Sequence, residues 1–133
     1  MCNELHMEKE SDPRPIPSFG IGYKLFTKRG EELYPLAVQF STNIYLKTDS
    51  RIEWTENRWR VSGSYGFCFF TNLKEAKRCM YAWKTSQCYN GDTIVLRKIK
   101  YGLGLGSCLE TNILNGIIPF RIALCKWFKV LLD

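Results

Sequence analysis

Residues 64–83, SYGFCFFTNLKEAKRCMYAW, place a run of aromatic residues directly before a helical pattern. In residues 65–70 apolar side chains occupy both faces of an alternating pattern, which is typical of a central strand. Asn72 and Glu75 then have the spacing of a helix N-cap and the third helical position. Apolar residues follow at intervals of three and four: Leu73, Ala76, Met80 and Trp83. The stretch therefore predicts a buried strand, a short junction and an amphipathic helix of about three turns.

Two runs of aromatic and branched residues, 20–26 and 32–40, precede this stretch and are separated by a loop that contains Gly30. This pattern predicts a β-hairpin. Pro35 has no N–H to donate, so we expect the second arm to be an edge or bulged strand. Residues 43–49 form a further short strand candidate.

The C-terminal half predicts strands. Residues 93–101 are apolar on both faces at first, and 102–109, GLGLGSCL, continue the period of two. Residues 117–132 fit both a helical pattern and an alternating one, and the alternation matches more positions, which favours a strand. The polar residues 51–66 contain two tryptophans and carry the weakest secondary-structure signal.

This order of elements predicts an α+β fold: an antiparallel sheet of about five to seven strands with one main helix packed on one face. The chain has 133 residues, enough for one compact domain. We expect residues 18–133 to form that domain. Residues 1–17 are acidic and rich in proline, and we expect them to be a disordered leader.

Charge is distributed unevenly along the chain. The formal net charge is +6, and residues 1–12 contain four carboxylates and one lysine, which leaves +9 for residues 13–133. A folded body of this charge attracts polyanions or acidic protein surfaces. The alternative is that the surplus lysines only maintain solubility.

The sequence shows neither a membrane-spanning run nor a signal peptide. A spanning helix needs about 20 apolar residues, and the apolar C-terminal run is interrupted by Arg121, Lys126 and Lys129. We therefore expect a cytoplasmic protein without a membrane partner. In that compartment the six cysteines are expected to be reduced.

Catalytic and metal signals are weak. A nucleophilic Cys68 would need a nearby base, and the one histidine, His6, lies in the leader, so a core role is favoured. The cysteines lack the close spacing of zinc ligands, and we expect no metal and no cofactor. GLGLG at 102–106 is not followed by a helical pattern, so packing is favoured over phosphate binding. With the carboxylates scattered, the chain leans towards a non-enzyme.

Basic and aromatic residues alternate in several segments, which is the strongest functional signal. Aromatic rings stack on bases or anchor protein interfaces, and guanidinium groups pair with phosphate or carboxylate. The alternative is that the tryptophans fill the core and the charges are solvated. The candidate binding residues are Arg58, Trp59, Arg60, Lys98, Lys100, Lys126 and Lys129.

Five segments resemble small bacteriophage and prophage proteins: GYKLF (22–26), LYPL (33–36), GFCFFTNLKEAK (66–77), DTIVLRKIKYG (92–102) and FRIALCKWFKVL (120–131). Such proteins open with a G-Y-K hairpin and carry a G-F-x-x-F strand before a short helix. The resemblance implies the same order of elements. It also implies binding to host machinery, since several of these proteins inhibit CRISPR and other defence systems. Cys68 departs from the pattern, because related strands often have histidine there.

We therefore expect a non-enzymatic, phage-type binding protein in the cytoplasm of a host cell. Its basic, aromatic surface would engage a host protein or ribonucleoprotein complex that handles nucleic acid, with inhibition of a defence system such as CRISPR as one outcome. The alternative is a small nucleotide-binding or ADP-ribosyltransferase-like enzyme. That enzyme would grip its ligand between the Gly66 strand and residues 102–106, with Glu110 as the nearest candidate carboxylate.

Overall fold

A computed structural model describes residues 11–30, 32–35, 51–53, 66–85, 91, 93–110 and 120–131. Within these ranges the chain is an α+β fold, mostly strand, with one helix, α2 (Leu73–Lys84). The strands are β1 (Ser11–Arg14), β2 (Phe19–Arg29), β3 (Glu32–Pro35), β4 (Arg51–Glu53), β5 (Phe67–Phe69), β6 (Thr93–Glu110) and β7 (Phe120–Val130). All their pairings are antiparallel, as the sequence predicts.

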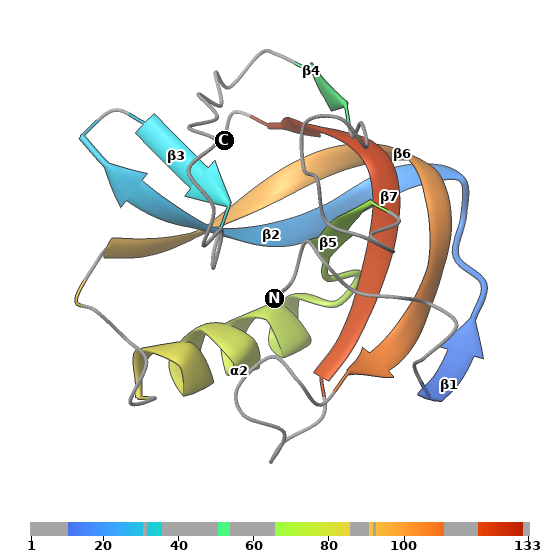
Figure 1. Cartoon of the computed structure of the whole chain (residues 1–133), viewed down its shortest axis with the longest axis horizontal. Helices are drawn as coiled ribbons and strands as arrows, with labels where there is room; N and C mark the ends of the chain where they lie inside the picture. Colours follow the sequence, from blue (N-terminus) through green and yellow to red (C-terminus); the bar gives the residue numbers. More distant parts are fainter. Residues whose placement is uncertain are drawn as a thin grey trace.

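Two long, curved strands, β6 and β7, lie at the centre of the sheet (Figure 1). The order is β3-β2-β6-β7-β4, while β1 also pairs with β6 and β5 also pairs with β7. The β6–β7 register shifts between Gly104 and Gly106, and Leu103 has a φ of 53°. Bulges bend a strand and increase its twist, so the glycine-rich part of β6 is where the sheet changes direction.

The hairpin prediction is confirmed by β2 and β3, which pair from Phe26 opposite Pro35 to Arg29 opposite Glu32. Gly30 follows with a φ of 62°, a conformation that glycine adopts without steric cost. β3 is the last strand on its side of the sheet order, which suits a strand that contains Pro35. The strand predicted for 117–132 is confirmed as β7, so the helical alternative is wrong.

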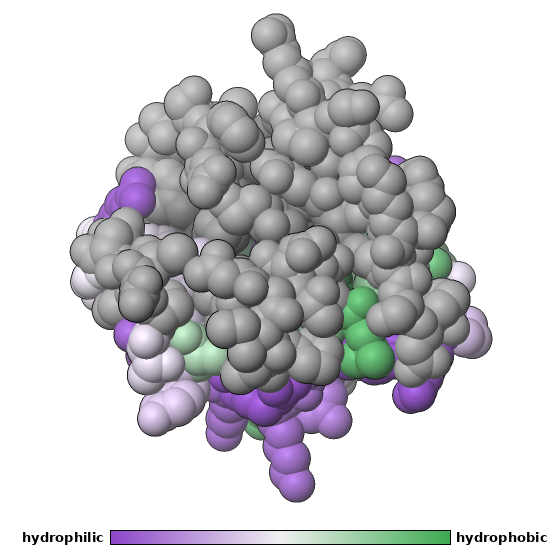
Figure 2. Space-filling model, turned by 60° about the horizontal axis from the view of Figure 1, so that its bottom comes forward, coloured by the Kyte–Doolittle hydropathy of each residue, from purple (hydrophilic) through white to green (hydrophobic). Residues whose placement is uncertain are grey.

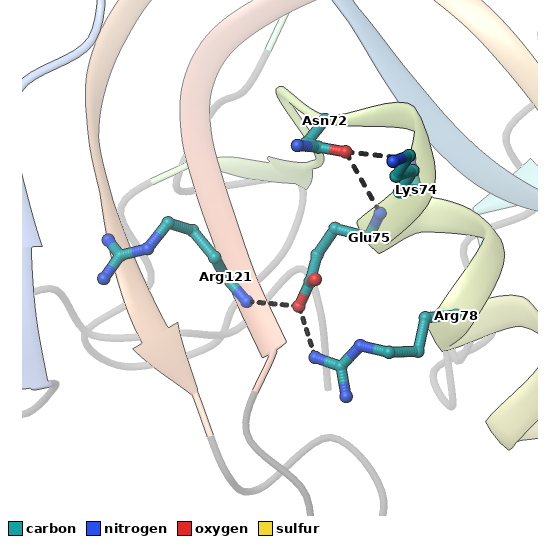
Figure 3. A network of polar contacts seen from close by, with 5 residues as sticks. All are labelled: Asn72, Lys74, Glu75, Arg78 and Arg121. Atoms are coloured by element: carbon teal, nitrogen blue, oxygen red, sulfur yellow. Dashed lines mark hydrogen bonds and ion pairs between the residues drawn. The ribbon is translucent and has the colours of Figure 1, made fainter.

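The predicted helix is confirmed as α2, with Asn72 as its N-cap. The Asn72 side chain accepts hydrogen bonds from the backbone N–H groups of Lys74 (2.8 Å) and Glu75 (3.3 Å) (Figure 3). Glu75 does not complete a capping box. Its carboxylate instead accepts from the backbone N–H of Arg121 in β7 (2.9 Å) and from the guanidinium of Arg78 (2.5 Å). Glu75 therefore links the first turn of the helix to the sheet.

Replacing Glu75 by alanine should lower the free energy of unfolding by about 1–3 kcal/mol, because the Arg121 N–H loses its partly buried acceptor. Glu75→Gln keeps an oxygen at this position and should retain most of that stability. Urea unfolding followed by circular dichroism measures both variants. Equal losses for alanine and glutamine would mean that the contact with Arg121 does not stabilise the protein.

The core consists of two clusters of buried residues. One contains Ala76 and Cys79 of α2 together with residues of β2, β5, β6 and β7. The other is rich in aromatic rings, among them Phe26, Phe67 and Phe128. Cys68 is only 1% exposed and belongs to the first cluster, as its core interpretation predicts. The helix stripe differs in detail from the prediction, since Cys79 is fully buried and Leu73 is exposed.

An isolated bridge between Tyr23 and Phe70 connects β2 with the chain just after β5. Tyr23 donates its N–H to Phe70 (2.8 Å) and accepts the N–H of Phe70 (2.7 Å). Because β5 also pairs with β7, the sheet curls until its two sides touch at this point. The aromatic-rich cluster draws its residues from the strands that take part in this curl.

Part of the expected leader is ordered. Ser11–Arg14 form β1, which pairs with β6 from Leu109 to Ser107. An extended, proline-containing segment suits an edge position, because its pairing depends on backbone groups rather than apolar side chains. The predicted strand at 43–49 lies outside the described residues. Within the described part of the chain, no helix has the length and apolar character needed to cross a membrane.

Candidate binding face

Cationic side chains from three neighbouring strands meet in one row across the sheet. Lys100 of β6 lies directly opposite Lys129 of β7, and Lys129 lies directly opposite Arg51 of β4. Ile21 of β2 completes the row on the other side of Lys100. Side chains of directly opposed residues emerge on the same face, about 5 Å apart. Lys98, two residues from Lys100 on β6, is exposed on this face as well.

A second row beside the cations contains Trp127, which lies opposite Gly102 on β6 and Glu53 on β4. The indole covers Gly102 so closely that a Cβ built there would be 2.1 Å from the ring. The Arg51 guanidinium stacks on the indole, 3.9 Å from the ring centroid, and the Phe19 ring is tilted against the indole at a centroid distance of 6.4 Å. These contacts leave Trp127 only 8% exposed.

We call this surface the basic face and define it as Arg51, Lys98, Lys100 and Lys129 with Phe19, Ile21 and Trp127. Its one acidic neighbour in the two rows is Glu53, which forms a 3.0 Å ion pair with Arg51. Like charges placed directly opposite each other destabilise a sheet. The Lys100–Lys129 pair therefore costs the fold stability, and an anion bound between the two ammonium groups would remove that cost.

The structure brings together some of the predicted binding residues. Lys98, Lys100 and Lys129 lie on the basic face, and Lys98 and Lys100 are exposed. Lys126 is half-buried and lies outside the two rows, next to the point where β6 and β7 change register. Arg58, Trp59 and Arg60 lie outside the described residues, so their predicted role stays a prediction.

Four members of the basic face were not among the predicted residues: Arg51, Phe19, Ile21 and Trp127. Arg51 belongs to a polar segment without a clear strand pattern, and its pairing with β7 supplies its position. Phe19 and Ile21 of β2 are 59% and 47% exposed. An available signal was the sequence FGIG at 19–22, where glycines alternate with the two apolar residues.

The four cysteines in the described part of the chain lie in the interior. Cys68, Cys79, Cys108 and Cys125 are buried and are not joined in disulfides. Burial raises the pKa of the Cys125 thiol to about 12, although the nearby positive charge of Lys24 acts in the opposite direction. A thiol with such a pKa is almost fully protonated at neutral pH and is a poor nucleophile.

The space beside the glycines that were proposed to grip a nucleotide is occupied by other atoms of the protein. A Cβ at Gly66 would lie 2.3 Å from the Cys125 carbonyl oxygen, and one at Gly104 would lie 2.4 Å from the Pro17 carbonyl oxygen. Gly102 faces Trp127. At these glycines the close contacts are therefore with the chain's own atoms, which favours the packing interpretation of the GLGLG segment.

Figure 2 shows one side of the molecule, on which hydrophilic side chains gather along the lower edge and hydrophobic ones occupy smaller areas. Large apolar side chains exposed in the described residues include Leu103 and Leu105 in addition to Phe19 and Ile21.

No protein-family model, curated protein or solved structure matches the chain.

Proposed function

We propose that this protein is a non-enzymatic binding protein whose basic face engages an anionic partner, specifically a nucleic-acid-handling complex of a host cell. The observation that carries the proposal is the direct opposition of Lys100 and Lys129, with Arg51 next in the same row. In this proposal α2 covers the part of the sheet that contains Leu25 and Ile94, which leaves the basic face open.

The electrostatics favour binding over a structural role. Arg51 is neutralised in part by Glu53, but no carboxylate in the described part of the chain forms an ion pair with Lys98, Lys100 or Lys129. Cations on neighbouring strands match the repeated charges of a phosphate backbone, and Phe19 supplies an exposed ring on which a base can stack. Inhibition of a host defence system would follow if the bound complex were part of one.

The proposal is tested with a fluorescein-labelled dodecamer of thymidine and fluorescence anisotropy at several salt concentrations. If about four phosphates are neutralised, the slope of log K against log salt is about −3, and affinity falls about 50-fold between 50 and 200 mM salt. The double variant Lys100→Gln, Lys129→Gln should make that slope shallower by about 1.4.

A matched control keeps the same change in net charge. Lys74→Gln, Lys77→Gln removes two exposed cations from α2, and its affinity and slope should remain those of the native protein. Affinity that does not depend on salt would contradict the proposal. Equal losses for the two double variants would mean that overall charge, and not the basic face, attracts the oligonucleotide.

A further inference from the structure

Part of the outer edge of β2, beside the basic face, has no paired strand in the described part of the chain. β2 pairs with β6 from Phe19 to Lys28, but on its other side β3 pairs only from Phe26 to Arg29. The bridge to Phe70 covers Tyr23, and the chain then enters α2 at Leu73. Among the described residues, no strand therefore pairs with this edge at Phe19–Gly22.

The backbone groups of Phe19 and Ile21 point to this uncovered edge. Tyr23 uses both its N–H and its C=O for Phe70, so these groups face away from β6. In an antiparallel ladder the direction repeats every second residue, which gives Ile21 and Phe19 the same orientation as Tyr23. Two N–H donors and two C=O acceptors are thus presented in line with the Tyr23–Phe70 bridge.

The side chains at this edge lack the usual protection against strand addition. Edge strands are commonly blocked by lysine, proline or a bulge. Here Phe19 and Ile21 are exposed, and the residues between and after them are Gly20 and Gly22. The β2–β6 pairing is regular throughout this region, so the backbone of this edge has the extended conformation that pairing with an added strand requires.

We propose that the Phe19–Gly22 edge of β2 binds an extended, acidic peptide segment of the partner protein by strand addition. Main-chain hydrogen bonds would hold the peptide, as in other β-augmentation complexes. The side chains on one face of the peptide, at every second residue, would contact Phe19 and Ile21, and glutamates among them would extend towards Lys98 and Lys100 on the next strand. A second copy of this chain fits less well, because it would bring two basic faces together.

This inference rests on the proposed function, since the peptide is taken to belong to the same anionic partner. The two can nevertheless fail separately. Binding of the thymidine dodecamer depends on the charges of the basic face, whereas strand addition depends on backbone donors and acceptors at the edge. Methylation of the peptide backbone removes hydrogen-bond donors without changing any charge, and therefore distinguishes them.

The probe is a fluorescein-labelled hexapeptide, Val-Thr-Glu-Thr-Glu-Thr, whose valine and glutamates lie on one face of a strand. It is compared with the same peptide methylated on alternate backbone nitrogens. Native protein should bind the unmethylated peptide at least tenfold more tightly. Ile21→Pro removes the outward N–H, and proline is tolerated at a strand edge. This variant should bind the unmethylated peptide at least tenfold more weakly than native protein does, and no more tightly than it binds the methylated peptide.

Circular dichroism and a cooperative melt establish that Ile21→Pro is folded. If it is not, the comparison of the two peptides on native protein decides the question. Equal affinity for both peptides would overturn strand addition and leave charge alone as the attraction. A folded Ile21→Pro with native peptide affinity would also overturn it, and a concentration-dependent dimer at this edge would assign the edge to a second copy instead.

Discussion

Gly102→Ala should lower the free energy of unfolding by about 2–3 kcal/mol, because the new methyl group would occupy the space of the Trp127 indole. The position leaves no room, since a Cβ would be 2.1 Å from one ring atom and 2.3 Å from the indole nitrogen. The ring would have to move away from Gly102, which would disturb its contact with the Arg51 guanidinium. The variant should therefore lose affinity for the thymidine dodecamer as well as stability.

A double-mutant cycle isolates the contact between Gly102 and Trp127. In a Trp127→Ala background the methyl group at position 102 meets no ring, and the same substitution should cost less than about 0.5 kcal/mol or stabilise the strand. Urea unfolding of the four proteins gives the coupling energy. If Gly102→Ala has the same cost in both backgrounds, the indole does not lie on Gly102.

Lys24→Glu should lower the free energy of unfolding by more than about 4 kcal/mol and leave little folded protein at room temperature. Lys24 is only 3% exposed, and its ammonium donates a 2.5 Å hydrogen bond to the Cys68 carbonyl oxygen. The ammonium is also 5.6 Å from the centroid of the Phe128 ring. A carboxylate at this site would be desolvated and would face the carbonyl oxygen and the negative face of the ring.

Lys24→Met is the matched variant, because it keeps most of the side-chain volume and removes only the ammonium. Its cost should be within about 2 kcal/mol, the range for losing one buried hydrogen bond. Thermal and urea unfolding of both variants test this difference. Similar stability for the glutamate and methionine variants would mean that residue 24 is solvated rather than buried.

Much of the fold was predictable because local signals agree with the tertiary structure. The Asn72 cap and the apolar spacing that follows specify α2. In the structure Asn72 caps the helix and Ala76 is buried, whereas Cys79 is buried in place of Leu73. Alternation predicted β6 and β7. In β7, however, every side chain from Ile122 to Cys125 is buried, because the sheet curls and the two core clusters lie on its two sides.

Elements that depend on pairing partners were less accessible from the sequence. β1 consists of Ser11–Arg14, and β4 of Arg51–Glu53 within a polar segment. Neither has an apolar alternation of its own, so the neighbouring strand determines where it forms. The burial of Lys24 was also hidden, because in the sequence it is an ordinary lysine between Tyr23 and Leu25 and only the tertiary structure encloses it.

The sequence indicated a basic, aromatic surface but did not identify all of the residues that form the basic face. The lysines of 98–100 and Lys129 were identified by their charge and their aromatic neighbours. Their convergence depends on the β6–β7 register, which changes between Gly104 and Gly106. A slip of one residue would move Lys129 to the other face of the sheet. Register of this kind is set by the whole sheet and cannot be read from either strand alone.

The position of the bound anion can be measured directly from amide and indole chemical shifts of ¹⁵N-labelled protein titrated with the thymidine dodecamer at low salt. The largest changes should occur at Arg51, Lys98, Lys100 and Lys129 and at the Trp127 indole N–H, and they should disappear as salt is added. The amides of Lys74 and Lys77 in α2 should not move. Changes concentrated on α2, or spread evenly over all surface lysines, would contradict a binding site on the basic face.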